Sequence, residues 1–166
     1  MEPYGKIEST SNQKEFTREF KIELPKEKLE SKGSKHFVEI NSADTTAFIM
    51  LPGIGSKLAL RIINFRDKLG GFYSVDQVGE TYGLADSTFQ KIRQYLTLKI
   101  TDVKKININT ATKDEMKTHP YLKWALANAI VEYRTQHGNY SSLEDIKKIS
   151  LITNDVFEKL KNYLTL

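Results

Sequence analysis

The sequence predicts an all-α protein with two tandem units of four short helices each, preceded by a mostly irregular N-terminal arm. Three observations lead to this fold class. Residues 40–98 align without a gap on residues 108–166, with 16 identities in 59 positions, whereas roughly three or four would be expected from ordinary composition. Helix-capping residues recur at matching positions in the two copies. The apolar stripe of the longest helix and the glycine that ends it also recur.

The repeat divides the chain into an arm, a first unit, a linker and a second, degenerate unit, at residues 1–36, 37–98, 99–105 and 106–166. The arm holds eight Lys/Arg and seven Asp/Glu and mostly lacks periodicity, which predicts a flexible segment. Within it, Phe16–Leu24 alternates apolar and charged residues and is a candidate edge strand that could pair with residues 38–40. The linker has no Gly or Pro and is expected to be extended.

Caps and apolar stripes predict four helices in the first unit. They are one helix capped by Asp44 and ending near Met50, one from Ser56 to Leu69, one capped by Ser74 with Gln77 at the capping-box position, and one from Ser87 to Leu96. A glycine turn separates the first two helices, and another turn precedes the last helix. Each unit is therefore expected to read helix, hairpin, helix, connector, helix, hairpin, helix.

The same signals recur in the second unit. Thr112 and Glu115 form a predicted capping box before its first helix. The next helix is predicted from Trp124 to His137, followed by Gly138. The pair Ser142 and Asp145 then repeats the third cap, which supports one supersecondary unit written twice; these two residues stand where Ser74 and Gln77 stand in the first unit.

Three short motifs of the first unit resemble the helix-hairpin-helix family. They are Ile40-Asn41-Ser42-Ala43, Leu51-Pro52-Gly53-Ile54-Gly55 and Phe72-Tyr73-Ser74. The pattern is most similar to the doubled form of the ComEA-like competence DNA-receptor domains; the similarity is good over residues 38–98 and weak over 106–166. The resemblance implies two tandem (helix-hairpin-helix)2 units. It also implies sequence-independent binding of duplex DNA, in which a hairpin gives backbone N–H groups to a phosphate.

The first hairpin has residue types that suit such a phosphate site. Gly53 can take a positive φ in a tight turn, and Gly55 has no Cβ to hold a phosphate away from the main chain. The N–H groups at the start of the next helix face the anion with the positive end of the helix dipole. Ile54 anchors the turn from below. The predicted DNA-binding residues are Gly53, Ile54, Gly55, Ser56, Lys57, Arg61, Gly83 and Lys91.

The other three hairpins depart from this pattern. The second, residues 82–86, keeps Gly83 but contains Asp86, whose charge repels a phosphate unless the side chain caps the following helix. The third, residues 119–123, has no glycine, and the fourth, residues 150–154, keeps only its central aliphatic residue. The two units are therefore not expected to bind DNA alike.

Several candidate contacts also have an ordinary structural interpretation. A small-residue turn between short helices is often a packing device, and Lys91 is typical of a solvated helix charge. Arg66 and Arg134 are interpreted as bonding the backbone that ends their own helices. Tyr121 and Trp124, which lie beside a helix start, are expected to be buried.

Composition narrows the classes of function. The net charge of +4 and the pI of about 9.1 favour an anionic partner, although residues 37–98 carry six Lys/Arg and six acids. The chain has no cysteine, and His36, His119 and His137 lack metal-ligand spacing, so no metal or cofactor is expected. No phosphate loop, nucleophile elbow or two-metal acid cluster occurs, and we expect a non-enzymatic protein. No apolar run is long enough for membrane insertion, and the start lacks the layout of a signal peptide.

The function expected from these observations is sequence-independent binding of double-stranded DNA. The resemblance adds a setting, bacterial DNA uptake in competence, and favours the bacterial envelope over the cytoplasm. An alternative of another class stays open: a protein-interaction or scaffold module of an envelope or secretion complex, in which the degenerate hairpins pack against partner proteins. The sequence does not fix the oligomeric state.

Overall fold

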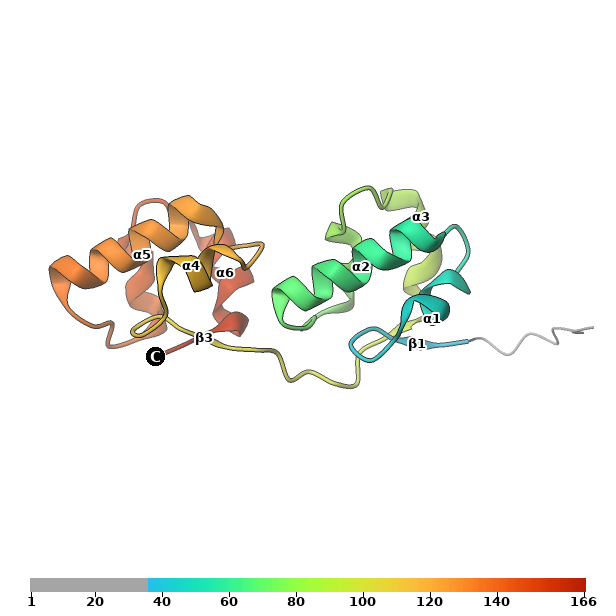
Figure 1. The fold of residues 1–166 in the computed structure, drawn as a ribbon, viewed down its shortest axis with the longest axis horizontal. Coiled ribbons are helices and arrows are strands. Elements are labelled where there is room, and N and C mark those ends of the chain that lie inside the picture. Colours follow the sequence, from blue (N-terminus) through green and yellow to red (C-terminus); the bar gives the residue numbers. More distant parts are fainter. Residues whose placement is uncertain (1–35) are drawn as a thin grey trace, which may run out of the picture. The chain divides into compact units, whose positions relative to one another are not determined.

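The computed structural model describes residues 36–166, which hold two repeats of one helical unit (Figure 1). The first repeat contains α1 (Thr45–Ile49), α2 (Ser56–Leu69), the 3-10 helix η1 (Val75–Glu80) and α3 (Asp86–Arg93). The second contains α4 (Lys113–Lys117), α5 (Lys123–His137), the 3-10 helix η2 (Leu143–Lys148), α6 (Asn154–Leu160) and the short 3-10 helix η3 (Lys161–Tyr163). The predicted mostly helical fold in two repeats is confirmed. The predicted arm, apart from residue 36, and its candidate strand Phe16–Leu24 lie outside the described residues.

Each repeat is closed by a short parallel strand pair that joins its beginning to its end. In the first repeat β1 (Val38–Glu39) pairs with β2 (Leu96–Thr97), and in the second β3 (Ile106–Asn107) pairs with β4 (Leu164–Thr165). The prediction of a last helix reaching Leu96 was wrong, because α3 ends at Arg93. The backbone beyond α3 instead accepts hydrogen bonds from the incoming strand, since the Val38 N–H donates to the Tyr95 carbonyl at 2.7 Å.

The repeated asparagine ties the start of each repeat to its connector. The Asn41 amide donates to the Phe72 carbonyl and accepts from the Phe72 N–H, both at 2.8 Å. In the second repeat Asn109 makes the same pair of bonds with Tyr140, at 3.1 and 2.8 Å. A side chain that satisfies both backbone groups of a buried aromatic residue holds the connector in one position.

The repeated arginine ties α2, and likewise α5, to the segment that precedes the first helix. Arg66 Nη1 donates to the Ala43 carbonyl at 2.7 Å, and Arg134 Nη1 donates to the carbonyls of Ile108 and Ala111 at 2.9 and 3.2 Å. The prediction that each arginine bonds the end of its own helix was wrong. Both guanidinium groups point across the repeat to carbonyl groups that no helix satisfies.

The predicted N-caps are confirmed. The Asp44 side chain accepts from the Ala47 N–H at 2.9 Å. Complete capping boxes occur at Ser74 with Gln77, Thr112 with Glu115, and Ser142 with Asp145. The third helix of each repeat is a 3-10 helix, and α5 begins at Lys123, one residue before the predicted start.

Each repeat buries its own apolar core. Equivalent positions supply both cores, such as Ile40, Phe48, Ile62 and Ile92 in the first and Ile108, Met116, Ile130 and Leu160 in the second. The two sets of four are fully buried, which explains why the apolar spacing recurs at an offset of 68 positions. No helix within residues 36–166 combines the length and apolarity required to cross a bilayer.

Candidate functional site

The first hairpin forms a turn whose outer surface is open. Gly53 adopts a left-handed conformation with φ of 82°, which favours glycine. Ile54 is only 4% exposed, and its N–H donates to the Leu51 carbonyl at 3.2 Å. The aliphatic side chain therefore fixes the turn from the core side, while Gly53 and Gly55 remain exposed.

Gly55 occupies a position where neither the backbone nor the packing requires glycine. Its φ of −91° and ψ of 173° suit any residue. A Cβ at this position would meet no heavy atom within 4 Å. Gly53 differs, because it needs its positive φ and a Cβ there would lie 3.1 Å from Thr88 Cγ2. The free space at Gly55 is thus on the solvent side of the main chain.

Unpaired backbone donors lie at Gly55 and directly after it in the sequence. The N–H groups of Gly55, Ser56 and Lys57 donate to no acceptor in the described residues. Gly55 is the N-cap of α2 and has no side chain that could cap the helix. Unpaired N–H groups at the start of a 14-residue helix, together with the helix dipole, form a site suited to an oxyanion.

Three exposed cations lie on the helices that follow the two hairpins of the first repeat, Lys57 and Arg61 on α2 and Lys91 on α3. Lys57, Arg61 and Lys91 have no carboxylate partner within residues 36–166. By contrast, Arg93 pairs with Asp76 at 2.7 Å and Lys159 pairs with Glu80 at 3.1 Å. Although the first repeat is neutral in total, the charges of these three cations are not neutralised by direct pairing.

The second hairpin lies beside the first, on the same side of the repeat. Gly53 of the first hairpin backs onto Thr88 of α3, and Gly83 of the second backs onto Arg61 of α2. Each hairpin therefore contacts the helix that follows the other hairpin. This reciprocal contact is the arrangement expected of two hairpins related by a pseudo-twofold axis.

The second hairpin is less suited to an anion than the first. Its N-cap is Ala85, which supplies no side-chain cap. The sequence predicts that Asp86 repels a phosphate unless its side chain caps α3. This carboxylate does not cap α3 but accepts from the Gln90 amide at 3.2 Å. Its negative charge therefore stays at the start of the helix, where a phosphate would have to approach.

The third hairpin, residues 119–123, is partly buried against the first repeat. His119 is only 3% exposed, and Tyr121 is half-buried. The Tyr121 hydroxyl accepts from the Gln77 amide at 3.0 Å and donates to Glu80 at 2.9 Å, so the hairpin contacts the first repeat. Lys123, where the first hairpin has Gly55, carries a strained φ of 33°.

The predicted burial of the aromatic pair was wrong for Trp124, which is 67% exposed, and Tyr121 is only half-buried. Trp124 stands where the first repeat has Ser56, and the positions of the two hairpin cations Lys57 and Arg61 are taken by alanines, Ala125 and Ala129. The fourth hairpin is also changed, because the Thr153 side chain accepts from the Val156 N–H at 3.3 Å and caps α6. The second repeat thus lacks the glycines of the first hairpin and the cations equivalent to Lys57 and Arg61.

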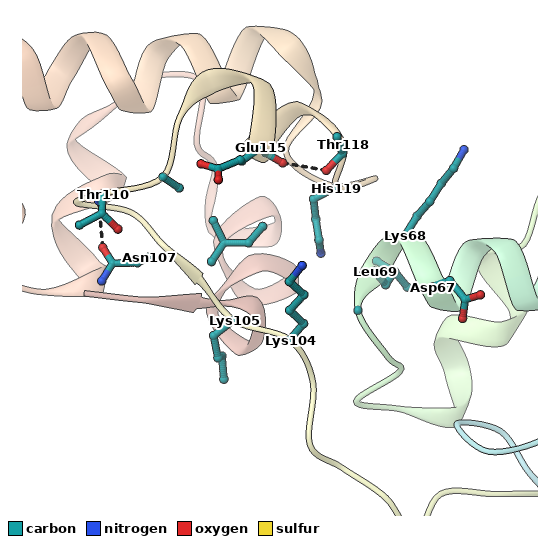
Figure 2. Close-up of a pocket in the computed structure, with 13 residues that line it drawn as sticks. Asp67, Lys68, Leu69, Lys104, Lys105, Asn107, Thr110, Glu115, Thr118 and His119 are labelled. Atoms are coloured by element: carbon teal, nitrogen blue, oxygen red, sulfur yellow. Dashed lines mark hydrogen bonds between the residues drawn. The ribbon is translucent and has the colours of Figure 1, made fainter.

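A pocket away from the first hairpin is lined by residues of both repeats (Figure 2). His119 points into this region toward Leu69, and burial lowers the pKa of its imidazole to about 4, so the ring is neutral near pH 7. Lysines and carboxylates line the pocket together, as Lys104 and Glu115 illustrate. Within residues 36–166 no three His, Asp or Glu side chains gather as metal ligands.

Sequence reasoning missed two features of the structure. Tyr82, at the tip of the second hairpin, is 84% exposed, and Arg61 lies over its ring. Gln77 and Tyr163 link the repeats through a hydrogen bond of 2.9 Å. An aromatic residue directly before a hairpin glycine was a visible signal for Tyr82, whereas nothing in the repeat pattern distinguishes Tyr163 from its twin Tyr95.

Comparison with known proteins agrees with this geometry. A family model described as the helix-hairpin-helix motif matches residues 33–97 and again residues 101–165. The chain is 40% identical over 60 residues to ComE operon protein 1 of Bacillus subtilis, covering 36% of this chain and 29% of that protein. It is 25% identical over 142 residues to endonuclease/exonuclease/phosphatase family domain-containing protein 1 of Danio rerio, covering 75% of this chain and 26% of that protein. The human protein of that name is 21% identical over 154 residues, covering 75% of this chain and 27% of that protein. The chain spans about a quarter of the length of these vertebrate relatives.

Proposed function

Because the chain belongs to the helix-hairpin-helix family, we propose that its first repeat binds duplex DNA without sequence preference, through backbone N–H groups of the first hairpin. The phosphate would lie over Gly55 and accept from the N–H groups at the start of α2. Lys57 and Arg61, one helical turn apart, would contact phosphates on either side, and Lys91 of α3 would add a third cation.

The observation that carries this proposal is the free space at Gly55. Neither the φ of −91° nor the packing at position 55 requires glycine. The absence of a side chain there is explained if a ligand must approach the main chain closely. The three unpaired N–H groups beside it give that ligand its chemistry, an oxyanion. Phosphate contacts position a protein on DNA but do not read bases, which supports binding without sequence preference.

The setting rests on similarity alone. The expected role in bacterial DNA uptake is supported by the likeness to ComE operon protein 1, which extends over 36% of the chain. We propose no catalytic activity for this chain, because its similarity to the vertebrate proteins covers only about a quarter of their length. The proposed role is that of a DNA-binding module.

The proposal is tested by fluorescence anisotropy of labelled duplexes of two unrelated sequences at several salt concentrations. We expect equal affinity for both sequences and a steep loss of affinity as salt rises. Gly55→Glu should weaken binding at least tenfold, because a carboxylate would occupy the phosphate position while its Cβ enters open space. The matched control is Gln136→Glu, which adds the same charge to exposed surface of α5 and should leave affinity unchanged.

Binding that is absent at low salt would overturn the proposal. The same holds if Gly55→Glu and Gln136→Glu weaken binding equally, because the effect would then come from net charge. Circular dichroism melting of both variants shows that the fold is retained.

A second function, protein interaction, is favoured for the second repeat by the exposure of Trp124. The Trp124 ring is 67% exposed, and Leu151 at the fourth hairpin is 54% exposed. The positions equivalent to Lys57 and Arg61 hold alanine in the second repeat and so carry no cation. A photo-crosslinking amino acid at position 124 in the native cell should then give a protein adduct, whereas the same group at Gln136 should not. Equal labelling at both positions, or none, would speak against this second function.

A further inference from the structure

Tyr82 stands out from the second hairpin while the residues beside it are fixed. Tyr82 is 84% exposed, whereas Thr81 before it and Leu84 two residues after it are 3% and 8% exposed. The Tyr82 hydroxyl makes no hydrogen bond within residues 36–166, and its ring packs on no other ring there. The turn thus presents a large aromatic surface that the described part of the chain does not use.

Arg61 holds this ring in position. Its guanidinium carbon lies 5.3 Å from the centre of the Tyr82 ring, and Nη1 donates to the Tyr82 carbonyl at 3.4 Å. A cation over one ring face restricts the orientation of an exposed side chain and leaves the opposite face for another partner. Because Arg61 has five N–H donors and makes this one hydrogen bond in the described residues, it can still contact a phosphate.

The position of the pair relates it to the first hairpin. Arg61 follows Lys57 by one turn of α2. Because Arg61 contacts Tyr82, and Gly53 and Gly83 each lie against the helix that follows the other hairpin, the ring of Tyr82 belongs to a turn next to the first hairpin. A nucleic acid held at the first hairpin would bring its neighbouring nucleotides to the second. The twin positions in the second repeat are Ser150 and Ala129, which supply neither ring nor cation.

We propose that Tyr82, oriented by Arg61, stacks on an unpaired base, so that the first repeat prefers DNA with a gap or a single-stranded end over intact duplex. This inference rests on the proposed DNA binding. Bases inside a duplex have both faces covered by their neighbours, whereas a base at a gap exposes a face. Stacking of one base on an aromatic side chain contributes about 1–3 kcal/mol, which corresponds to about a 5- to 150-fold gain in affinity.

The test compares one duplex in intact form with the same duplex carrying a one-nucleotide gap, and measures the ratio of the two affinities by anisotropy. For the wild type we expect the gapped form to bind about tenfold more tightly. Tyr82→Ser should bring the ratio close to one, and Tyr82→Phe should keep it because the ring is retained. The matched control is Leu151→Ser, which removes an exposed apolar side chain at the fourth hairpin and should leave the ratio unchanged.

A second readout follows the base itself. With 2-aminopurine as the unpaired base, wild-type protein should quench its fluorescence by stacking, and Tyr82→Ser should not. A wild-type ratio of one overturns the inference, as does a ratio that survives Tyr82→Ser or is lost in Tyr82→Phe. These outcomes differ from failure of the proposed function, which would show as missing salt-sensitive binding to the intact duplex.

Discussion

The Tyr121 hydroxyl of the second repeat donates a hydrogen bond to the Glu80 carboxylate of the first repeat, with an O–O distance of 2.9 Å. Tyr121 stands where the first repeat has Gly53, so the change from glycine to tyrosine places an aromatic side chain in the contact between the repeats. Gln77 takes part in the same contact, because its amide donates to both Tyr121 and Tyr163. Its carbonyl oxygen meanwhile completes the capping box of η1. The two equivalent hairpins therefore differ, because the first is open to solvent at Gly55 and the third joins the repeats through Tyr121.

Replacing the tyrosine at this contact should destabilise the protein. Tyr121→Ala removes a half-buried ring and leaves Gln77 with one phenol partner, and we expect the free energy of unfolding to fall by about 2 kcal/mol. Tyr121→Phe keeps the ring and should cost about 1 kcal/mol. Urea denaturation followed by circular dichroism measures both values. Equal stability of Tyr121→Ala and the wild type would contradict the contact.

The identical lysines Lys91 and Lys159 should differ in their effect on DNA binding. Lys91 has no carboxylate partner in the described residues, whereas Lys159 pairs with Glu80 at 3.1 Å. If Lys91 contacts a phosphate, Lys91→Ala should reduce the slope of log affinity against log salt by about 0.9. Lys159→Ala is the matched control and should leave the slope unchanged. The same slope for both variants and the wild type would remove Lys91 from the proposed site.

Much of the fold could be predicted because the signals for it are local. Asp44, Ser74 and Thr112 mark helix starts through side-chain hydrogen bonds that span only three residues. The open turn around Gly53 followed from glycine at the position that requires a positive φ. In both cases the residues that cause the structure are neighbours in the sequence.

The features that could not be predicted depend on distant partners. The strand at Leu96 forms only because the distant residues 38–40 pair with it. The helical pattern of the sequence extended to the same residue, so the sequence predicted a helix there. Arg66 was expected to bond its own helix, but carbonyl groups left unpaired before α1 lie within its reach. Tyr163 and Tyr95 are twins in sequence, yet only Tyr163 contacts the other repeat, through Gly71 and Gln77.

The buried imidazole of His119 should make stability depend on pH. Burial lowers its pKa from 6.5 to about 4, so the folded state favours the neutral ring. Its contribution is complete above about pH 6.5 and is lost as the pH falls toward 4, because the unfolded chain binds a proton first. We expect the free energy of unfolding to decrease by about 2 kcal/mol over this range.

The variant that isolates this effect is His119→Leu, since Leu51 fills the equivalent position of the first repeat. Urea unfolding at pH 7, 6 and 5 should show a smaller decrease for the variant than for the wild type. Asp145, whose pKa its hydrogen bonds with Lys148 and Ser142 lower to about 2, titrates below this window in the folded protein. If the free energy of unfolding fell equally with pH in both proteins, His119 would not titrate as its burial requires.

Trp124 should report whether the second repeat touches DNA. It is the one tryptophan of the chain, it is 67% exposed, and it occupies the position equivalent to Ser56. Because the second repeat lacks the glycine and the cations of the first hairpin, saturating duplex DNA should leave its emission unchanged. In the double variant Trp124→Phe with Ser56→Trp, the fluorophore moves to the proposed phosphate site, and DNA should quench it. Quenching of Trp124 in the wild type would mean that the second repeat also lies against DNA, and absence of quenching at position 56 would place the bound DNA elsewhere.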